Sequence, residues 1–276
     1  RGRYWPEPLI QINPNYKRSG TVQQLAKDGV LHTDCAHIFQ AGKTEGKSAD
    51  LHLYVHQLQS LAKAQKHQSF VVTTGTGSGK SLSFFIPIID CIVKAKAADP
   101  QKRTRAIVIY PMNALANSQL EELDKFLHGY PAGEAPFAVA RYTGQESAAE
   151  RQEIASNPPD ILLTNFMMLE LILTRFEDVD RQVVEHCQGL EFLVLDELHT
   201  YRGRQGADVA LLVRRLRERL KADQLVCIGT SATMSSTGTQ ADRNQTVASV
   251  ASLLFGASIT ENDVIGETLQ RVTNPA

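Results

Sequence analysis

The chain has 276 residues, of which 42% are hydrophobic, so it is long enough to bury the core of one large domain or two small ones. Its formal net charge of -1 excludes the strongly basic composition that would by itself indicate nucleic-acid binding. Any role on nucleic acid must therefore be argued from motifs.

The cysteines are scattered, and no Cys-x-x-Cys pair occurs, which argues against a zinc site or a disulfide framework and favours a reducing cytosol. They are Cys35, Cys91, Cys187 and Cys227. No apolar run reaches the length of a membrane-spanning helix, and no secretory signal follows the N-terminus. We therefore predict a cytoplasmic protein without membrane contact. Because the chain begins at Arg1 rather than Met, we expect it to be a piece of a longer protein.

Residues 1–50 differ in character from the rest. Pro6, Pro8 and Pro14 interrupt the first part, and one short helix is predicted near Val22–Asp28. The segment Gly42–Lys47 has the composition of a flexible loop. We interpret residues 1–50 as an N-terminal extension and residues 51–276 as the main domain.

From residue 51 onward, short apolar segments alternate with segments of helical periodicity. The apolar segments are rich in Val, Ile and Leu, as is typical of strands buried on both faces. The predicted strands are Phe70–Thr73, Ala106–Tyr110, Phe137–Tyr142, Asp160–Thr164, Phe192–Asp196 and Leu225–Thr230. The predicted helices are Lys80–Lys96, Asn113–Leu127, Ala207–Lys221 and Val247–Phe255. This alternation predicts an α/β fold with a mostly parallel sheet flanked by helices on both faces.

A glycine-rich turn follows the first of these strands and precedes a helix, which is the context of a phosphate-binding loop. Lys80 would place a positive charge at the β- and γ-phosphates of ATP, and the Ser81 hydroxyl would ligate Mg²⁺. Thr74 stands where the strict G-x-x-x-x-G-K-[ST] pattern has its first glycine. The predicted nucleotide-binding residues of this loop are Thr74, Gly75, Thr76, Gly77, Ser78, Gly79, Lys80 and Ser81.

Two adjacent carboxylates, Asp196 and Glu197, end the strand that begins at Phe192. A phosphate-binding loop needs an acidic strand end to hold Mg²⁺ and to orient the attacking water. We assign Asp196 to Mg²⁺ and Glu197 to the water, as general base. With Lys80, these two residues form the predicted catalytic set.

The stretch Asp196-Glu197-Leu198-His199 has the form of a DExH box. Together with Thr76–Ser81 it resembles superfamily 2 helicases, whose phosphate loop commonly lacks the first glycine. The resemblance implies the first RecA-like P-loop domain of an ATP-dependent motor. Leu53–Gln57, just before the first strand, looks like the Q motif, in which Gln57 would read the adenine edge.

Further motifs of that family follow in its order up to residue 233. Those that resemble contacts to the backbone of a nucleic-acid strand comprise Pro111, Asn113, Thr143, Gly144, Thr164 and Asn165. Those that would couple the state of ATP to strand binding comprise His199, Ser231, Ala232 and Thr233. One departure is Met112-Asn113, where many relatives have Thr-Arg.

The stretch Glu197–Gly203 is the most distinctive within the superfamily. It resembles large bacterial DNA helicases related to the Hrq and Mrf repair helicases and to the helicase of the DISARM phage-defence system. Asn13–Tyr16 and Tyr54–Gln57 are similar to that group as well. The resemblance implies DNA rather than RNA as the partner, with phage defence or DNA repair as the setting.

After Thr233 only about one helix and a tail remain, too little for another domain of ordinary size. We therefore expect the second RecA-like domain, with its arginine fingers, elsewhere in the same protein. This chain alone is expected to hydrolyse ATP weakly or not at all. An alternative is a P-loop ATPase that acts as a protein switch or remodeller; ATPase activity indifferent to DNA and RNA would favour it.

Overall fold

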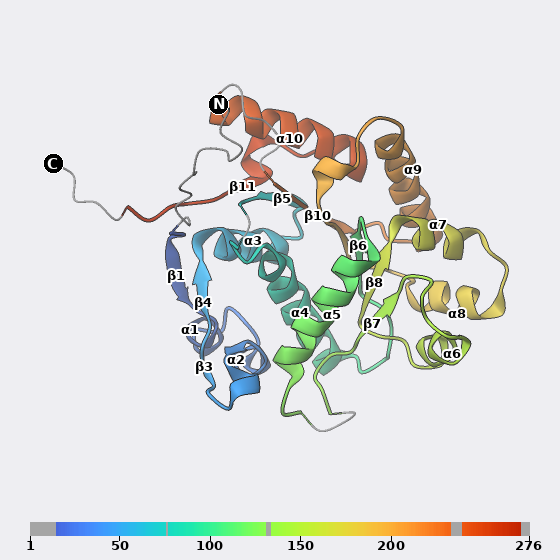
Figure 1. The fold of residues 1–276 in the computed structure, drawn as a ribbon, viewed down its shortest axis with the longest axis horizontal. Helices are drawn as coiled ribbons and strands as arrows, with labels where there is room; N and C mark the ends of the chain where they lie inside the picture. Colours follow the sequence, from blue (N-terminus) through green and yellow to red (C-terminus); the bar gives the residue numbers. More distant parts are fainter. Residues whose placement is uncertain (1–14, 76, 131–133, 233–238, 272–276) are drawn as a thin grey trace, which may run out of the picture.

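The computed structural model describes residues 15–75, 77–130, 134–232 and 239–271. At its centre lies a sheet of order β11-β5-β10-β9-β6-β8-β7, in which all neighbouring strands are parallel (Figure 1). Its strands are β5 (Phe70–Thr73), β6 (Ala106–Tyr110), β7 (Val139–Tyr142), β8 (Ile161–Asn165), β9 (Phe192–Leu195), β10 (Val226–Ser231) and β11 (Val264–Gly266). The predicted parallel α/β sheet is thus confirmed.

Successive residues of each central strand point to opposite faces and enter two separate cores. On β6, Ile107 and Ile109 pack into one core, whereas Val108 and Tyr110 pack into the other. One face is covered by α3 (Val55–Gln65), α4 (Lys80–Ala98) and α5 (Asn113–Leu127). The other is covered by α6 (Ala148–Ser156), α7 (Phe166–Thr174), α8 (Asp178–His186), α9 (Gly203–Arg219) and α10 (Gln240–Phe255).

The segment before residue 51 builds small elements of its own. Two antiparallel pairs form, β1 with β4 and β2 with β3. The elements are β1 (Arg18–Thr21), α1 (Val22–Lys27), α2 (Thr33–Ile38), β2 (Gln40–Ala41), β3 (Ala49–Asp50) and β4 (His52–Tyr54). The helix predicted at Val22 is present. The segment predicted as a flexible loop instead holds a 3₁₀ turn, Lys43–Glu45, in the connection between β2 and β3.

Several element boundaries differ from the prediction. The strand expected from Phe137 begins at Val139, and the last predicted helix begins at Gln240 rather than Val247. The sequence reading missed α3, α6, α7 and α8. It also missed β11, because this short strand forms only by pairing with β5 across almost two hundred residues of chain.

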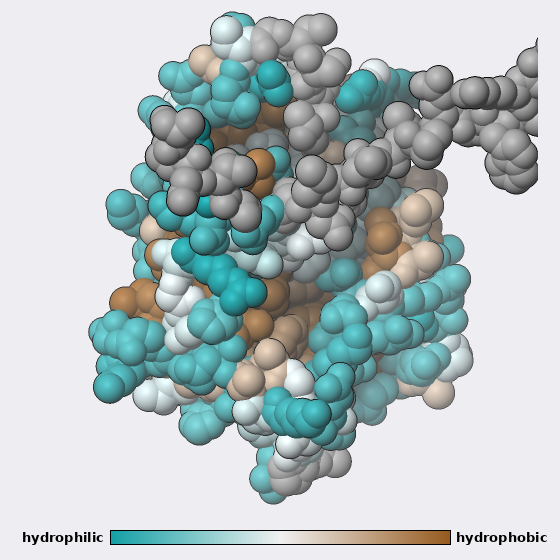
Figure 2. All heavy atoms as spheres, turned by 60° about the vertical axis from the view of Figure 1, so that its left-hand side comes forward, coloured by the Kyte–Doolittle hydropathy of each residue, from teal (hydrophilic) through white to brown (hydrophobic). Residues whose placement is uncertain are grey.

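The first and last described segments lie side by side. The Lys17 N–H donates to the Thr268 carbonyl over 2.8 Å, and the Gln270 N–H donates to the Asn15 carbonyl over 2.7 Å. On the face of the molecule drawn in Figure 2, teal hydrophilic residues predominate, and brown hydrophobic residues lie mostly in recesses between them. No helix within the described ranges is long and apolar enough to span a membrane.

Candidate active site and nucleic-acid interface

The parallel strands deliver the predicted site residues to one edge of the sheet, because all their carboxyl ends point the same way. The neighbouring strands β5, β10 and β9 carry the phosphate loop, Ser231 and the two carboxylates. The next strands, β6, β8 and β7, carry the segments predicted to contact nucleic acid. We name the two parts of this edge by their predicted roles, the nucleotide half and the strand-binding half; they meet between β9 and β6.

The glycine-rich loop turns tightly between β5 and α4. Gly77 and Gly79 adopt positive φ angles of 76° and 67°, which favour glycine. The buried hydroxyls of Thr74 and Ser78 lie 2.6 Å apart and close the loop across its base. Thr74, which stands where the strict pattern has a glycine, thus adds a hydrogen bond across the loop. Thr76 lies outside the described residues.

Residues of α3 support the loop from the side. The Gln57 amide donates through Nε2 to the Gly79 carbonyl over 2.9 Å, and its Oε1 accepts from the Tyr54 N–H over 2.8 Å. His56 Nε2 lies 2.9 Å from the Ser78 carbonyl oxygen. A Cβ atom at Gly79 would lie 2.7 Å from Gln57 Nε2, so a larger residue at this position would displace the Gln57 amide. In this structure both ends of the Gln57 amide are engaged by the protein itself.

The start of the loop is held by the two described ends of the chain. The Gly75 N–H donates to Glu267 Oε2 over 2.9 Å. A Cβ atom at Gly75 would lie 2.9 Å from the Tyr16 hydroxyl, so Tyr16 also covers this residue closely. Sequence reasoning missed both contacts, because neither residue lies in a recognisable motif.

The lysine and the second carboxylate face each other across the site. Lys80 Nζ lies 3.7 Å from Glu197 Oε1. Glu197 has a φ of 54°, a left-handed conformation that is rare for residues other than glycine. Its Oε2 is buried and receives no hydrogen bond from the described residues, although His199 Nδ1 lies 3.2 Å away. The carboxylate therefore keeps a free acceptor atom at the edge of the nucleotide half.

Asp196 and Glu197 share a partner that the sequence did not reveal. The hydroxyl of Thr230, which is fully buried, donates to Asp196 Oδ1, and the Glu197 N–H donates to the same hydroxyl oxygen over 3.1 Å. Burial raises the pKa of Asp196, the neighbouring Glu197 charge raises it too, and the Thr230 hydrogen bond and Lys80 lower it. The only available signal was the position of Thr230, one residue before the Ser-Ala-Thr motif.

We expect Thr230→Val to reduce the free energy of unfolding by about 1–3 kcal/mol at neutral pH, because it leaves a buried carboxylate without its donor. The pKa of Asp196 should rise further, so the native state would hold this proton even more tightly than the unfolded chain. Stability then falls further in the variant as pH rises from the unfolded-state pKa through the native pKa of Asp196, and the stability loss is smaller in acid. Urea unfolding at several pH values measures this effect.

The control is Thr246→Val, which removes an exposed hydroxyl that donates to the Asp242 carbonyl of its own helix. It should leave stability nearly unchanged at every pH. A Thr230→Val protein with wild-type stability across the pH range would show that the hydroxyl does not support Asp196.

In the strand-binding half, Asn165 connects three of the predicted segments. Its Nδ2 donates to Asn113 Oδ1 over 2.7 Å and to the Thr143 carbonyl over 3.1 Å. Its Oδ1 accepts from the Met168 N–H and caps α7. The Thr164 hydroxyl is fully buried and donates to the Tyr142 carbonyl over 2.6 Å, so it links the ends of β8 and β7. Pro111 is half-buried at the end of β6, and the next side chain, Met112, is 60% exposed.

The predicted coupling residues sit at the junction of the two halves. Ser231 Oγ lies 3.4 Å from His199 Nδ1 and donates to the Ala232 carbonyl over 2.7 Å. The structure thereby brings His199 and Ser231 together beside Glu197, whereas Thr233 falls outside the described residues. Tyr201 in the distinctive Glu197–Gly203 stretch is buried, while Arg202 and Arg204 are exposed.

A phosphate loop before a helix and two carboxylates at the carboxyl edge of a parallel sheet define a P-loop ATPase. The chain belongs to the DEAD/DEAH box helicase family, whose sequence model matches residues 54–241. The predicted relationship to superfamily 2 helicases is thus confirmed, and the chain is an ATP-dependent helicase motor domain.

Three similar proteins place the chain within this family. It is 33% identical to the uncharacterized ATP-dependent helicase YprA of Bacillus subtilis over 67% of this chain and 23% of YprA. It is 27% identical to the Druantia protein DruE of Escherichia coli over 66% of this chain and 16% of DruE. The crystal structure of the DUF1998 helicase MrfA bound to DNA has a TM-score of 0.67 and 26% identity, covering 92% of this chain and 29% of that chain. The chain thus spans less than a third of each of these three proteins.

Proposed function

We propose that residues 51–276 form the first RecA-like domain of a DNA helicase or translocase, with its second RecA-like domain elsewhere in the same protein. The observation that carries this proposal is the shared sheet edge. There the Lys80–Glu197 pair, 3.7 Å apart, adjoins the Asn165 network that joins the predicted strand contacts. The similarity to MrfA, a helicase solved with DNA, favours DNA over RNA.

In the proposed site, ATP binds at the loop from Thr74 to Ser81, with Lys80 at its terminal phosphates. Ser81 and Asp196 would hold Mg²⁺, which neutralises charge on the phosphates when bound. The donor set fits, because burial disfavours the charged form of Asp196 and a divalent cation beside it would restore that form. Gln57 would meet the adenine by exchanging one of its present contacts.

Glu197 is the proposed general base. Its free buried oxygen atom can accept a proton from a water aligned with the terminal phosphate of ATP. The Thr230 hydroxyl holds the backbone of Glu197 in place, and Lys80 balances the negative charge. Arginine fingers from the second domain would complete the site and raise the rate by about 10³–10⁵.

The proposed strand contacts are Pro111, Asn113, Thr143, Gly144, Thr164 and Asn165. Most of them offer hydrogen bonds suited to phosphates rather than to base edges, so we expect little sequence preference. His199, Ser231, Ala232 and Thr233 would report the state of ATP to this half. Phage defence and DNA repair are the settings that we propose, and the free cysteines agree with a cytosolic location.

The proposal is tested by ATP turnover of the full-length protein without nucleic acid and with single-stranded DNA, duplex DNA or RNA. We expect strong stimulation by DNA. Stimulation by RNA alone would contradict the DNA assignment, whereas equal turnover in all four reactions would favour a protein switch or remodeller. Duplex separation by this chain alone should be undetectable.

A further inference from the structure

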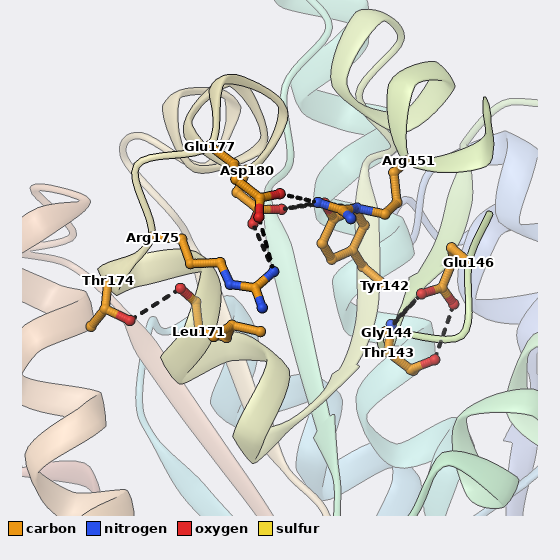
Figure 3. Close-up of polar contacts among 10 residues, drawn as sticks. All are labelled: Tyr142, Thr143, Gly144, Glu146, Arg151, Leu171, Thr174, Arg175, Glu177 and Asp180. Carbon is orange, nitrogen blue, oxygen red and sulfur yellow. Dashed lines mark hydrogen bonds and ion pairs between the residues drawn. The ribbon is translucent and has the colours of Figure 1, made fainter. Parts of the chain in front are cut away.

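The loop after β7 contains a complete anion-binding site that is filled by the chain's own carboxylate (Figure 3). The N–H groups of Thr143 and Gly144 each donate to Glu146 Oε2 over 2.8 Å. The Thr143 hydroxyl donates to Oε1 over 3.0 Å, and Arg141 Nε donates to the same atom over 2.7 Å. The Glu146 side chain is only 4% exposed, so these donors hold it inside the loop.

This donor set has the chemistry of a phosphate site. Successive backbone N–H groups form a concave nest for anions, and a guanidinium and a hydroxyl add charge-assisted and neutral hydrogen bonds. Burial alone would raise the pKa of Glu146, but the bonds from Thr143 and Arg141 outweigh it and lower the pKa. The loop therefore stabilises a negative charge at neutral pH.

The base of this loop is firmly held. Tyr142, the last residue of β7, donates its hydroxyl to the buried Asp180, and Arg151 of α6 contacts both residues. The Tyr142 carbonyl accepts a hydrogen bond from the Thr164 hydroxyl. Figure 3 shows this cluster on one side of Tyr142 and Glu146 on the other. Of these parts, the Glu146 side chain can leave by rotation about its own bonds while the backbone stays in place.

We propose that Glu146 is an internal substitute for a nucleic-acid phosphate: its carboxylate fills the Thr143–Gly144 nest in the free protein, and a backbone phosphate of the bound strand displaces it. The inference rests on the proposed function of this loop. Arg141 is neutralised by Glu146 before binding, so strand binding at the loop exchanges one anion for another. The affinity of the loop for the nucleic-acid strand is therefore lower than it would be if no carboxylate occupied these donors.

Binding of a fluorescent oligo-dT to the full-length protein, measured by anisotropy at several salt concentrations, tests this. Glu146→Gln should bind about 10-fold tighter, because it removes a competitor worth about one charge-assisted hydrogen bond. The slope of log binding constant against log salt concentration should become steeper by about 0.7, since Arg141 then meets a phosphate without a bound carboxylate. Glutamine keeps an oxygen acceptor for the loop, and thermal unfolding verifies that the variant is folded.

The matched control is Glu150→Gln, which removes the same charge from the exposed cap of α6. There Glu150 bonds Ser147, and glutamine is an equally suitable capping partner. We expect wild-type affinity and salt dependence. Equal gains in both variants would overturn the proposal, because they would reflect net charge alone. Unchanged or weaker binding by Glu146→Gln would also overturn it and make Glu146 a support of the loop.

A second measurement separates this inference from the function on which it rests. If the wild-type protein binds no oligonucleotide, the proposed function fails, and inorganic phosphate then serves as the probe. Phosphate should shift the amide resonances of Thr143 and Gly144 in Glu146→Gln and leave them in place in the wild type. No shift in the variant would show that the nest accepts only its own carboxylate.

Discussion

Glu197→Gln is expected to lower DNA-stimulated ATP turnover of the full-length protein by about 10²–10⁴-fold, the usual contribution of a general base. The amide cannot take the proton that Glu197 would accept in the proposed mechanism. Nucleotide affinity should be retained, because glutamine has the same size and removes a carboxylate that competes for Lys80 at 3.7 Å. Steady-state turnover and equilibrium binding of a fluorescent ATP analogue measure the two effects separately.

The control for this substitution is Glu185→Gln on α8, where the exposed carboxylate lies 3.9 Å from Arg181 of the same helix. It should turn over ATP at the wild-type rate. Normal turnover by Glu197→Gln would show that another group activates the water and would remove Glu197 from the catalytic set.

Lys80→Ala should act one step earlier, on nucleotide binding itself. Lys80 begins α4 with its side chain only 15% exposed, so its charge is directed into the loop. Loss of a charged hydrogen-bond partner costs about 1.5–3 kcal/mol, which corresponds to an affinity about 10–150-fold weaker. The variant also leaves the Glu197 carboxylate without its cation, which adds repulsion toward the phosphates.

Titration with a fluorescent ATP analogue measures this loss, with Lys125→Ala as the comparison. Lys125 is exposed on α5 and pairs with Glu122 of the same helix, so its removal should leave nucleotide affinity unchanged. If Lys80→Ala bound the analogue as tightly as wild type, the loop would hold phosphates by its backbone alone. The two lysine variants thus separate a site effect from a change in net charge.

Much of the fold could be predicted because its signals are local. Strands such as Phe192–Leu195 are apolar throughout, which distinguishes strands buried on both faces from amphipathic ones. The elements that were missed depend on context. The helix α6 has almost no apolar stripe and begins with a Ser147–Glu150 capping box, while β11 is stabilised by pairing with β5.

The same distinction applies to the candidate site. Lys80, Asp196 and Glu197 lie in contiguous motifs whose strand-to-loop context brings them to one edge, so sequence alone could nominate them. Thr230 bonds both Asp196 and Glu197, and Glu267 bonds Gly75; in each case the partner is more than thirty positions away. Such contacts depend on side-chain packing in three dimensions, and no spacing rule predicts them. The contact of Glu146 with the Thr143–Gly144 loop could not be predicted for the opposite reason. Glu146 is close in sequence, but many loops contain an acidic residue at such a distance without this contact.

The pairing of the two described ends has a mechanical consequence. Tension applied to the chain at Gln270 would be carried by its backbone bond to Asn15 and then by β11, which lies parallel to β5. Because β5 leads directly into the glycine-rich loop, this load path ends at that loop, and Glu267 adds a direct hydrogen bond to Gly75. A pull from that side would therefore strain the loop before it reached the strand-binding half.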